Sequence, residues 1–173
     1  MNIQLIAAVT LLILSMVAKA SDTSTTTSLA DLKNYQVNNA KMVSAGLPNK
    51  QHFEALKTMG VTHVVDLIPD DRTEQMAWMK KLDFQYHNIA VDWQNPTLKN
   101  FHDYVSAMQQ SEKTRGITLT HCRLNWRGAV FTYLYRVTQL GEAEADAKQD
   151  MLAIWTPNDT WQHFINQVLA AYQ

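Results

Sequence analysis

The only cysteine of this chain, Cys122, lies between an apolar, β-branched segment and a helix-forming one. Residues 116–140 read GITLTHCRLNWRGAVFTYLYRVTQL and predict a strand, a tight loop and a helix that begins just after Arg127. The N-terminus of a helix offers unpaired N–H groups and a partial positive charge. A cysteine held there is stabilised as its thiolate, and its pKa falls from about 8.5 to roughly 3.5–7.5. The pattern therefore predicts a nucleophilic sulfur.

Arg127 adds a second group to this loop. Its guanidinium is a fixed fork of donors that binds two oxygens of a phosphate or a similar oxyanion. Thiolate, amides and guanidinium on one loop predict a nucleophile that faces a bound tetrahedral anion. The alternative is that Cys122 is a buried, inert residue that behaves as a small hydrophobic group.

The rest of the chain predicts the elements that position this loop. Strand-like and helix-like segments alternate, which predicts an α/β fold with three layers, a mostly parallel central sheet and helices on both faces. In such sheets, ligands bind beyond the carboxyl ends of the strands, where Cys122 is expected. The expected strands are 41–45, 61–67, 84–91 and 116–120, and the expected helices are 49–59, 72–82, one opened by Asn95 and Pro96, 128–140, 142–155 and 158–171.

Three segments carry a family resemblance. HCRLNWRG (121–128), SAGLPNKQHFEALKTMGVTHVVDLIPDD (44–71) and YHNIAVDWQNPT (86–97) resemble small bacterial relatives of the dual-specificity and protein tyrosine phosphatases. These relatives are akin to the phosphatase-like domain of beta-lactamase hydrolase-like proteins. The resemblance covers about residues 40–140. It implies attack of a cysteine thiolate on a phosphomonoester, which gives a thiophosphate intermediate that water hydrolyses.

The resemblance implies a role for each catalytic residue. Cys122 is the nucleophile, Arg127 binds the phosphoryl oxygens, and Asp92 is the acid for the leaving oxygen and later the base for water. Asp92 can instead be a loop or capping carboxylate. Asp70 and Asp71 are rival acids, but they follow a different strand and are expected at a turn or a helix start.

The other residues of the loop are expected to line the substrate, namely His121, Arg123, Leu124, Asn125, Trp126 and Gly128. The side chain of His121 is expected to hydrogen-bond to the loop backbone, or else to be an ordinary histidine at a strand end. Trp93 and Trp126 are expected either to form the wall of a pocket or to pack in the core.

Two departures from the phosphatase pattern leave other functions open. Only four residues separate Cys122 from Arg127, where these phosphatases have five, and Gly128 replaces the usual Ser or Thr whose hydroxyl helps the thiolate to leave. One alternative is a non-catalytic protein that binds phosphate. The other is a rhodanese-like sulfurtransferase, since Cys122, Arg123 and Arg127 fit the Cys-Arg-x-x-x-Arg spacing of that family.

Composition limits the expected partners. The chain has 15 basic and 16 acidic residues, and this balance argues against nucleic acid, which requires clustered positive charge. The six histidines show no HExxH spacing and there is no Cys-x-x-Cys, so no metal is expected. The phosphatase chemistry implied by the resemblance needs no organic cofactor either. The expected partner is a phosphorylated small molecule or a phosphoprotein.

The first residues predict export. The apolar run 3–17 and the small-x-small sequence Ala18-Lys19-Ala20 predict a signal peptide over residues 1–20, with an uncleaved anchor as the alternative. Residues 21–28 (SDTSTTTS) have no apolar side chain to bury, so a disordered lead-in is expected over 21–30, and 31–173 predict a single phosphatase-like domain. We therefore expect a periplasmic or secreted protein with no stable membrane association after cleavage.

Overall fold

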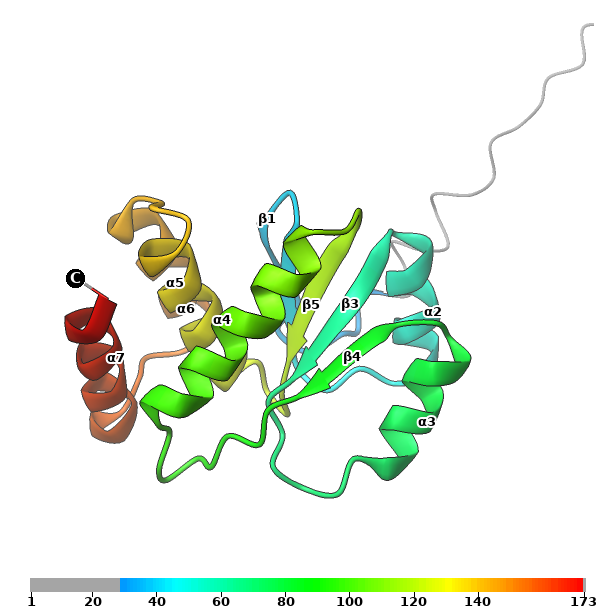
Figure 1. The fold of residues 1–173 in the computed structure, drawn as a ribbon, viewed down its shortest axis with the longest axis horizontal. Coiled ribbons are helices and arrows are strands. Elements are labelled where there is room, and N and C mark those ends of the chain that lie inside the picture. Colours follow the sequence, from blue (N-terminus) through cyan, green and yellow to red (C-terminus); the bar gives the residue numbers. More distant parts are fainter. Residues whose placement is uncertain (1–28, 173) are drawn as a thin grey trace, which may run out of the picture.

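Five short strands form one mixed sheet in the computed structural model, which describes residues 29–172 (Figure 1). The strand order is β1-β2-β5-β3-β4, and only β1 runs antiparallel to its neighbour. The strands are β1 (Gln36–Asn39), β2 (Met42–Ala45), β3 (Val61–Asp66), β4 (Gln85–Asn88) and β5 (Ile117–His121). The predicted signal peptide and residues 21–28 of the predicted lead-in lie outside the described residues.

Six helices cover the two faces of this sheet within the described residues (Figure 1). They are α2 (Lys50–Thr58), α3 (Thr73–Lys81), α4 (Leu98–Glu112), α5 (Trp126–Thr138), α6 (Glu144–Ile154) and α7 (Asp159–Tyr172). α2 and α3 lie on one face and α4 to α7 on the other. The predicted three-layer α/β architecture is confirmed.

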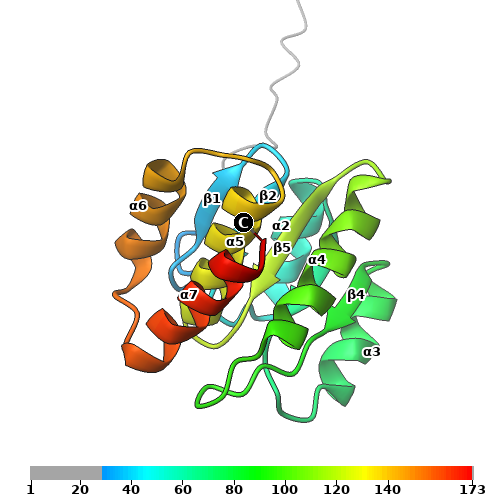
Figure 2. The ribbon, with the colours of Figure 1, turned by 60° about the vertical axis from the view of Figure 1, so that its left-hand side comes forward.

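The alternation of side chains along the strands creates two separate cores. Val64 and Val65 are neighbours in β3, yet Val64 packs under α2 and α3 while Val65 packs in the larger core under α4 and α5. α5 lies between the sheet and the outer pair α6 and α7 (Figure 2), so its residues from Arg127 to Arg136 are all buried.

Several predicted boundaries are wrong. α4 does not begin at Asn95 and Pro96, because Thr97 is the N-cap and forms a reciprocal capping box with Asn100. The strand predicted over 84–91 ends at Asn88. β1 has no apolar alternation and was not expected. Leu29, placed in the disordered lead-in, instead packs in the core beneath α2 and α3.

The parallel strands bring their following loops to one edge of the sheet. Figure 1 shows the segments after β3, β4 and β5 leaving the sheet at the same lower edge. The segment after β2, which begins at Gly46, reaches the same edge because β2 is parallel to β5. Among residues 29–172, no helix combines the length and the apolar character needed to cross a membrane.

Candidate active site

Cys122 lies directly after β5, at the carboxyl edge of the sheet. Its backbone N–H donates to the carbonyl of Ala45 (3.3 Å), and the residue is 1% exposed and belongs to the larger hydrophobic core. Cys122 thus lies between the end of β5 and the start of α5, in a strand–loop–helix as the sequence predicted.

The N-terminus of α5 has no side-chain cap. The first helical hydrogen bond runs from the N–H of Ala129 to the carbonyl of Asn125 (2.8 Å), and the side chain of Asn125 does not cap the helix. The N–H groups at the start of a helix have no carbonyl within the helix to accept them. In α2 and α4, by contrast, a reciprocal capping box occupies such groups. The helix end next to Cys122 can therefore donate to an anion.

Arg127 lies in the first turn of this helix and is nearly buried, at 8% exposed. Its Nε donates to the carbonyl of Val91 (3.0 Å), and its guanidinium carbon lies 5.5 Å from the ring centre of Trp93. Nη1 and Nη2 make no hydrogen bond to any other described residue. The guanidinium of Arg127 is thus held through Nε, and its two terminal nitrogens are available for an oxyanion.

The same hydrogen bond brings the β4–α4 loop to the cysteine loop. Asp92 directly follows Val91, is exposed, and accepts the N–H of Gln94 (2.8 Å) at Oδ1. Asp92 therefore lies in the loop that contacts Arg127, as the resemblance implied, and its Oδ2 has no hydrogen bond among the described residues.

Four tryptophans support this arrangement. The rings of Trp126 and Trp155 stack at 5.3 Å and 13°, and Trp93 lies 5.1 to 5.6 Å from Trp126, Trp155 and Trp161. The indole N–H of Trp161 donates to the carbonyl of Trp93 (3.1 Å). Of the two interpretations of Trp93 and Trp126, the structure supports packing. The contacts of Trp155 and Trp161 with Trp93 join distant segments and have no local signature in the sequence.

Asn125 explains why glycine follows Arg127. Asn125 is fully buried with φ = 63°, and its Nδ2 donates to the carbonyl of Asn34 (2.8 Å) and to Oγ of Ser44 (3.0 Å). A Cβ at Gly128 would collide with Oδ1 of Asn125. Asn125 therefore supports the loop from within, and its side chain, expected to line the substrate, is buried against Asn34 and Ser44.

The exposed residues of the loop are Arg123 and Leu124. The carbonyl of Arg123 accepts the N–H of Leu47 (3.2 Å), and that of Leu124 accepts Nδ2 of Asn34 (2.8 Å). The guanidinium of Arg123 pairs with Asp70. Asp70, expected at a turn, thus also lies beside the loop and remains a rival acid.

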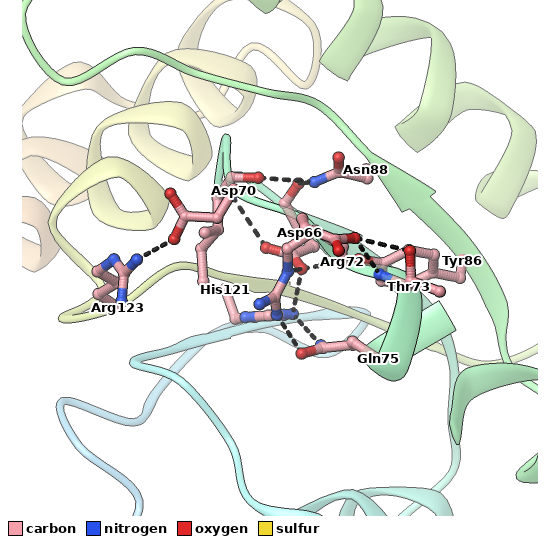
Figure 3. A network of polar contacts seen from close by, with 11 residues as sticks. Asp66, Asp70, Arg72, Thr73, Gln75, Tyr86, Asn88, His121 and Arg123 are labelled. Atoms are coloured by element: carbon pink, nitrogen blue, oxygen red, sulfur yellow. Dashed lines mark hydrogen bonds and ion pairs between the residues drawn. The ribbon is translucent and has the colours of Figure 1, made fainter. Parts of the chain in front are cut away.

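A buried polar network joins the ends of β3 and β5 (Figure 3). Asp66 is fully buried, and its carboxylate accepts hydrogen bonds from the N–H of Ile68 (2.9 Å), from Nε of Arg72 (2.6 Å) and from the hydroxyl of Tyr86 (2.7 Å). Nε2 of His121 lies 3.7 Å from the same carboxylate. Both oxygens of the buried charge are therefore satisfied, which is the condition for tolerating it.

The tautomer of His121 follows from its neighbours. Arg72 donates to Oε1 of Gln75, so the amide nitrogen of Gln75 faces Nε2 of His121 (3.0 Å) and donates to it. The proton of the neutral ring is then on Nδ1, which is buried and has no partner among the described residues. The prediction that this side chain bonds the loop backbone is not met, because Gln75 and Asp66 are its polar contacts.

Burial makes this histidine hard to protonate. Desolvation lowers the pKa of His121 to about 4, with Asp66 opposing the shift and Arg72 adding to it. His121 is thus neutral at physiological pH and fully buried, so it supports the site and does not reach a substrate.

The contributions of Asp66, Gln75, Tyr86 and Asn34 to the site were not predicted from the sequence. The one available signal was a carboxylate at the end of a β-branched strand, which is expected to have a charged partner when buried. Within residues 29–172, no three His, Cys, Asp or Glu side chains gather as a metal site requires.

Because the pKa of His121 is lower in the folded state than in the unfolded chain, acid should destabilise the protein. The unfolded chain binds the proton from about pH 6.5 downwards, and the folded protein only near pH 4, so stability is lost between these values. The resulting decrease in the free energy of unfolding approaches about 3 kcal/mol. Urea unfolding followed by circular dichroism at several pH values measures it. His121→Gln should lose clearly less stability over this window, and an equal loss would contradict the assignment.

The comparisons with known proteins agree with this geometry. No family model matches the chain, and no curated protein matches it. One crystal structure of a phosphatase-like DUF442 protein from Shewanella putrefaciens CN-32 has 31% identity and a TM-score of 0.70, and the match covers 82% of this chain and 92% of that one. A second crystal structure of a DUF442 protein from this organism has 29% identity and a TM-score of 0.73, and the match covers 84% of this chain and 97% of that one.

A more distant likeness extends to further phosphatases. P. aeruginosa TpbA matches with 21% identity and a TM-score of 0.65, over 80% of this chain and 88% of its own. The catalytic domain of the S. cerevisiae PP-IP phosphatase SIW14 matches with 15% identity and a TM-score of 0.66, and the match covers 78% of this chain and 85% of that one. At this identity the likeness shows a shared fold. Together with the DUF442 match, it favours the phosphatase resemblance over the rhodanese-like one. The chain belongs to the DUF442 family of cysteine-based, protein tyrosine phosphatase-like proteins.

Proposed function

We propose that this protein hydrolyses phosphomonoesters with Cys122 as the nucleophile. The observation that carries the proposal is the uncapped N-terminus of α5 directly after Cys122, with Arg127 in its first turn and both terminal nitrogens of Arg127 available. Helix amides and a guanidinium on one side of a sulfur favour the thiolate and a bound phosphoryl group together. No metal or organic cofactor is needed for this chemistry.

The proposed reaction has two steps. The thiolate of Cys122 attacks phosphorus, the bond from phosphorus to the ester oxygen breaks, and Asp92 gives its proton to that oxygen. Water then attacks the thiophosphate while the carboxylate of Asp92 takes its proton, which releases phosphate and the thiolate. Amides 126–128 and Arg127 stabilise the charge on the phosphoryl oxygens in both steps.

The structural neighbours illustrate the range of phosphorylated groups that this fold accepts. TpbA has been crystallised with phosphotyrosine, and PTPMT1 with PI(5)P. For this chain the proposed substrate class is a phosphorylated small molecule or a phosphoprotein. The predicted signal peptide leads us to propose that it is met in the periplasm or outside the cell.

Binding without turnover is the second candidate function. Two observations favour it: Cys122 is only 1% exposed, and Gly128 provides no hydroxyl for the sulfur as leaving group. Such a protein would use the same amides and Arg127 to hold an anion. The two candidates differ only in whether the sulfur reacts.

Cys122→Ser distinguishes them. We expect the wild type to release phosphate from para-nitrophenyl phosphate and Cys122→Ser to be slower by roughly 10³-fold or more, since the nucleophile is lost. Inorganic phosphate should still raise the melting temperature of the variant, because the amides and Arg127 remain. A wild type that is stabilised by phosphate but releases none from about pH 5 to 8 would favour binding without turnover.

The acid is tested by comparing two carboxylates at the same edge. Asp92→Asn should lower kcat by roughly 10²–10⁴-fold for an alkyl phosphate, and less for para-nitrophenyl phosphate, whose leaving group needs little protonation. Asp70→Asn is the matched control and removes only the partner of Arg123. A larger loss in Asp70→Asn, with the same dependence on leaving group, would assign the acid to Asp70.

Gly128 and Asn125 should behave as a coupled pair. Gly128→Ser alone should cost about 1–3 kcal/mol of stability, because the new Cβ collides with Oδ1 of Asn125. Adding Asn125→Gly removes the collision, and glycine accepts the positive φ at that position. The double variant should therefore be more stable than the sum of the single changes predicts. Urea unfolding of the four proteins measures this coupling, and simple additivity would refute the steric argument.

A further inference from the structure

A groove opens beside the cysteine loop, between the start of α2 and the start of α3. Its volume is about 350 Å³, and it is lined by Leu47, Pro48, Asn49, Asp71, Arg72, Glu74, Gln75 and Trp78. Leu47 is hydrogen-bonded to the carbonyl of Arg123, and the amide of Gln75 contacts His121. The groove thus adjoins the loop that would hold the phosphoryl group.

Some of the backbone N–H groups at the helix ends that face this groove already have partners. At the start of α2, Asn49 and His52 satisfy each other's backbone N–H groups. At the start of α3, the carboxylate of Asp71 accepts the N–H of Thr73 (2.9 Å) and its hydroxyl (2.6 Å). The N-cap residue of α3, Arg72, provides no side-chain cap, but the carboxylate of Asp71 occupies the first N–H of this helix and would repel a second phosphate.

The arginines near the groove are neutralised. Arg72 pairs with the buried carboxylate of Asp66, and Arg123 pairs with Asp70. Arg127 has no carboxylate within ion-pair distance among the described residues. The positive charge around the site is therefore enough for one phosphoryl group.

The remaining charge of the groove is negative. Asp71 and Glu74 are exposed and make no ion pair with any described residue. The hydrogen bonds from Thr73 lower the pKa of Asp71, so this carboxylate stays ionised at any working pH. Leu47, Pro48 and the half-buried ring of Trp78 provide apolar surface beside these charges.

We propose that this groove binds the residue next to the phosphorylated side chain of a peptide and selects a lysine or arginine there over an acidic residue. The inference rests on the proposed function, since it concerns the substrate of the same site. A basic side chain would lay its aliphatic stem on Leu47, Pro48 and Trp78 and direct its charge to Asp71 and Glu74. A substrate with several phosphates would bring negative charge against the same carboxylates.

Matched phosphotyrosine peptides with lysine, alanine or glutamate at the flanking positions test this selection. We expect kcat/KM for the lysine peptide to exceed that for the glutamate peptide by about 5- to 30-fold at low salt, and the ratio to shrink at high salt. Glu74→Gln combined with Asp71→Asn should bring the ratio close to one, while the amide oxygen of asparagine can still accept the hydrogen bonds from Thr73. Asp103→Asn, on the other face of the sheet, removes one half-exposed carboxylate, which pairs with Lys99, and should leave the ratio unchanged.

Two further arms separate the inference from the proposed function. If the wild type releases nothing from para-nitrophenyl phosphate, the proposed function fails, and the selection is then tested by fluorescence anisotropy of the same labelled peptides on Cys122→Ser. Equal kcat/KM values for the lysine and glutamate peptides, or equal affinities in the anisotropy assay, would overturn the inference. Faster hydrolysis of an inositol polyphosphate or of phosphocholine than of the lysine peptide would overturn it as well.

Discussion

The hydrogen bond from Nε of Arg127 to the carbonyl of Val91 connects the two loops on which the proposed chemistry depends. The arginine belongs to the loop that follows the nucleophile, and the carbonyl immediately precedes Asp92. Without this bond the guanidinium and the candidate acid would have no fixed relation to each other. Trp93 stabilises the same contact by lying against the guanidinium and within a cluster of three other tryptophans. Positioning of this kind is a large part of what an enzyme contributes to catalysis.

Beneath these loops, the charge of Asp66 organises the strand ends. The carboxylate is fully buried at the end of β3 and is satisfied by a backbone amide, an arginine and a tyrosine. A buried charge with this many partners is costly to displace, because removing one partner leaves the others without compensation. His121, which immediately precedes the nucleophile, is held as a neutral ring against the same group. The edge of the sheet that presents Cys122 is therefore rigid.

The sequence allowed the α/β architecture and the strand–loop–helix at Cys122 to be predicted, because hydrophobic periodicity and the residues at helix ends are local signals. The loop after β4, to which the family resemblance assigned Asp92, contacts Arg127 through Val91 in the structure. Asn125 was not predictable as a buried residue, since its burial depends on Asn34 and Ser44, which are distant in the sequence. The pairing of Arg123 with Asp70 and the partners of Asp66 are likewise long-range contacts with no local signature. Thr97 was missed as a cap because Asn95 and Pro96 carry the same type of signal two residues earlier.

The segment before β1 has a consequence for how the loop retains its shape. Asn34 donates its side-chain amide to Leu124 and accepts that of Asn125 at its carbonyl, so it exchanges two hydrogen bonds with a loop about ninety residues further along the chain. Segments joined in this way open together in local fluctuations. Detachment of this short stretch would release the backbone around the sulfur while the sheet remains intact. The integrity of the anion loop is thus coupled to the short stretch before β1, a region that a comparison limited to the loop itself would overlook.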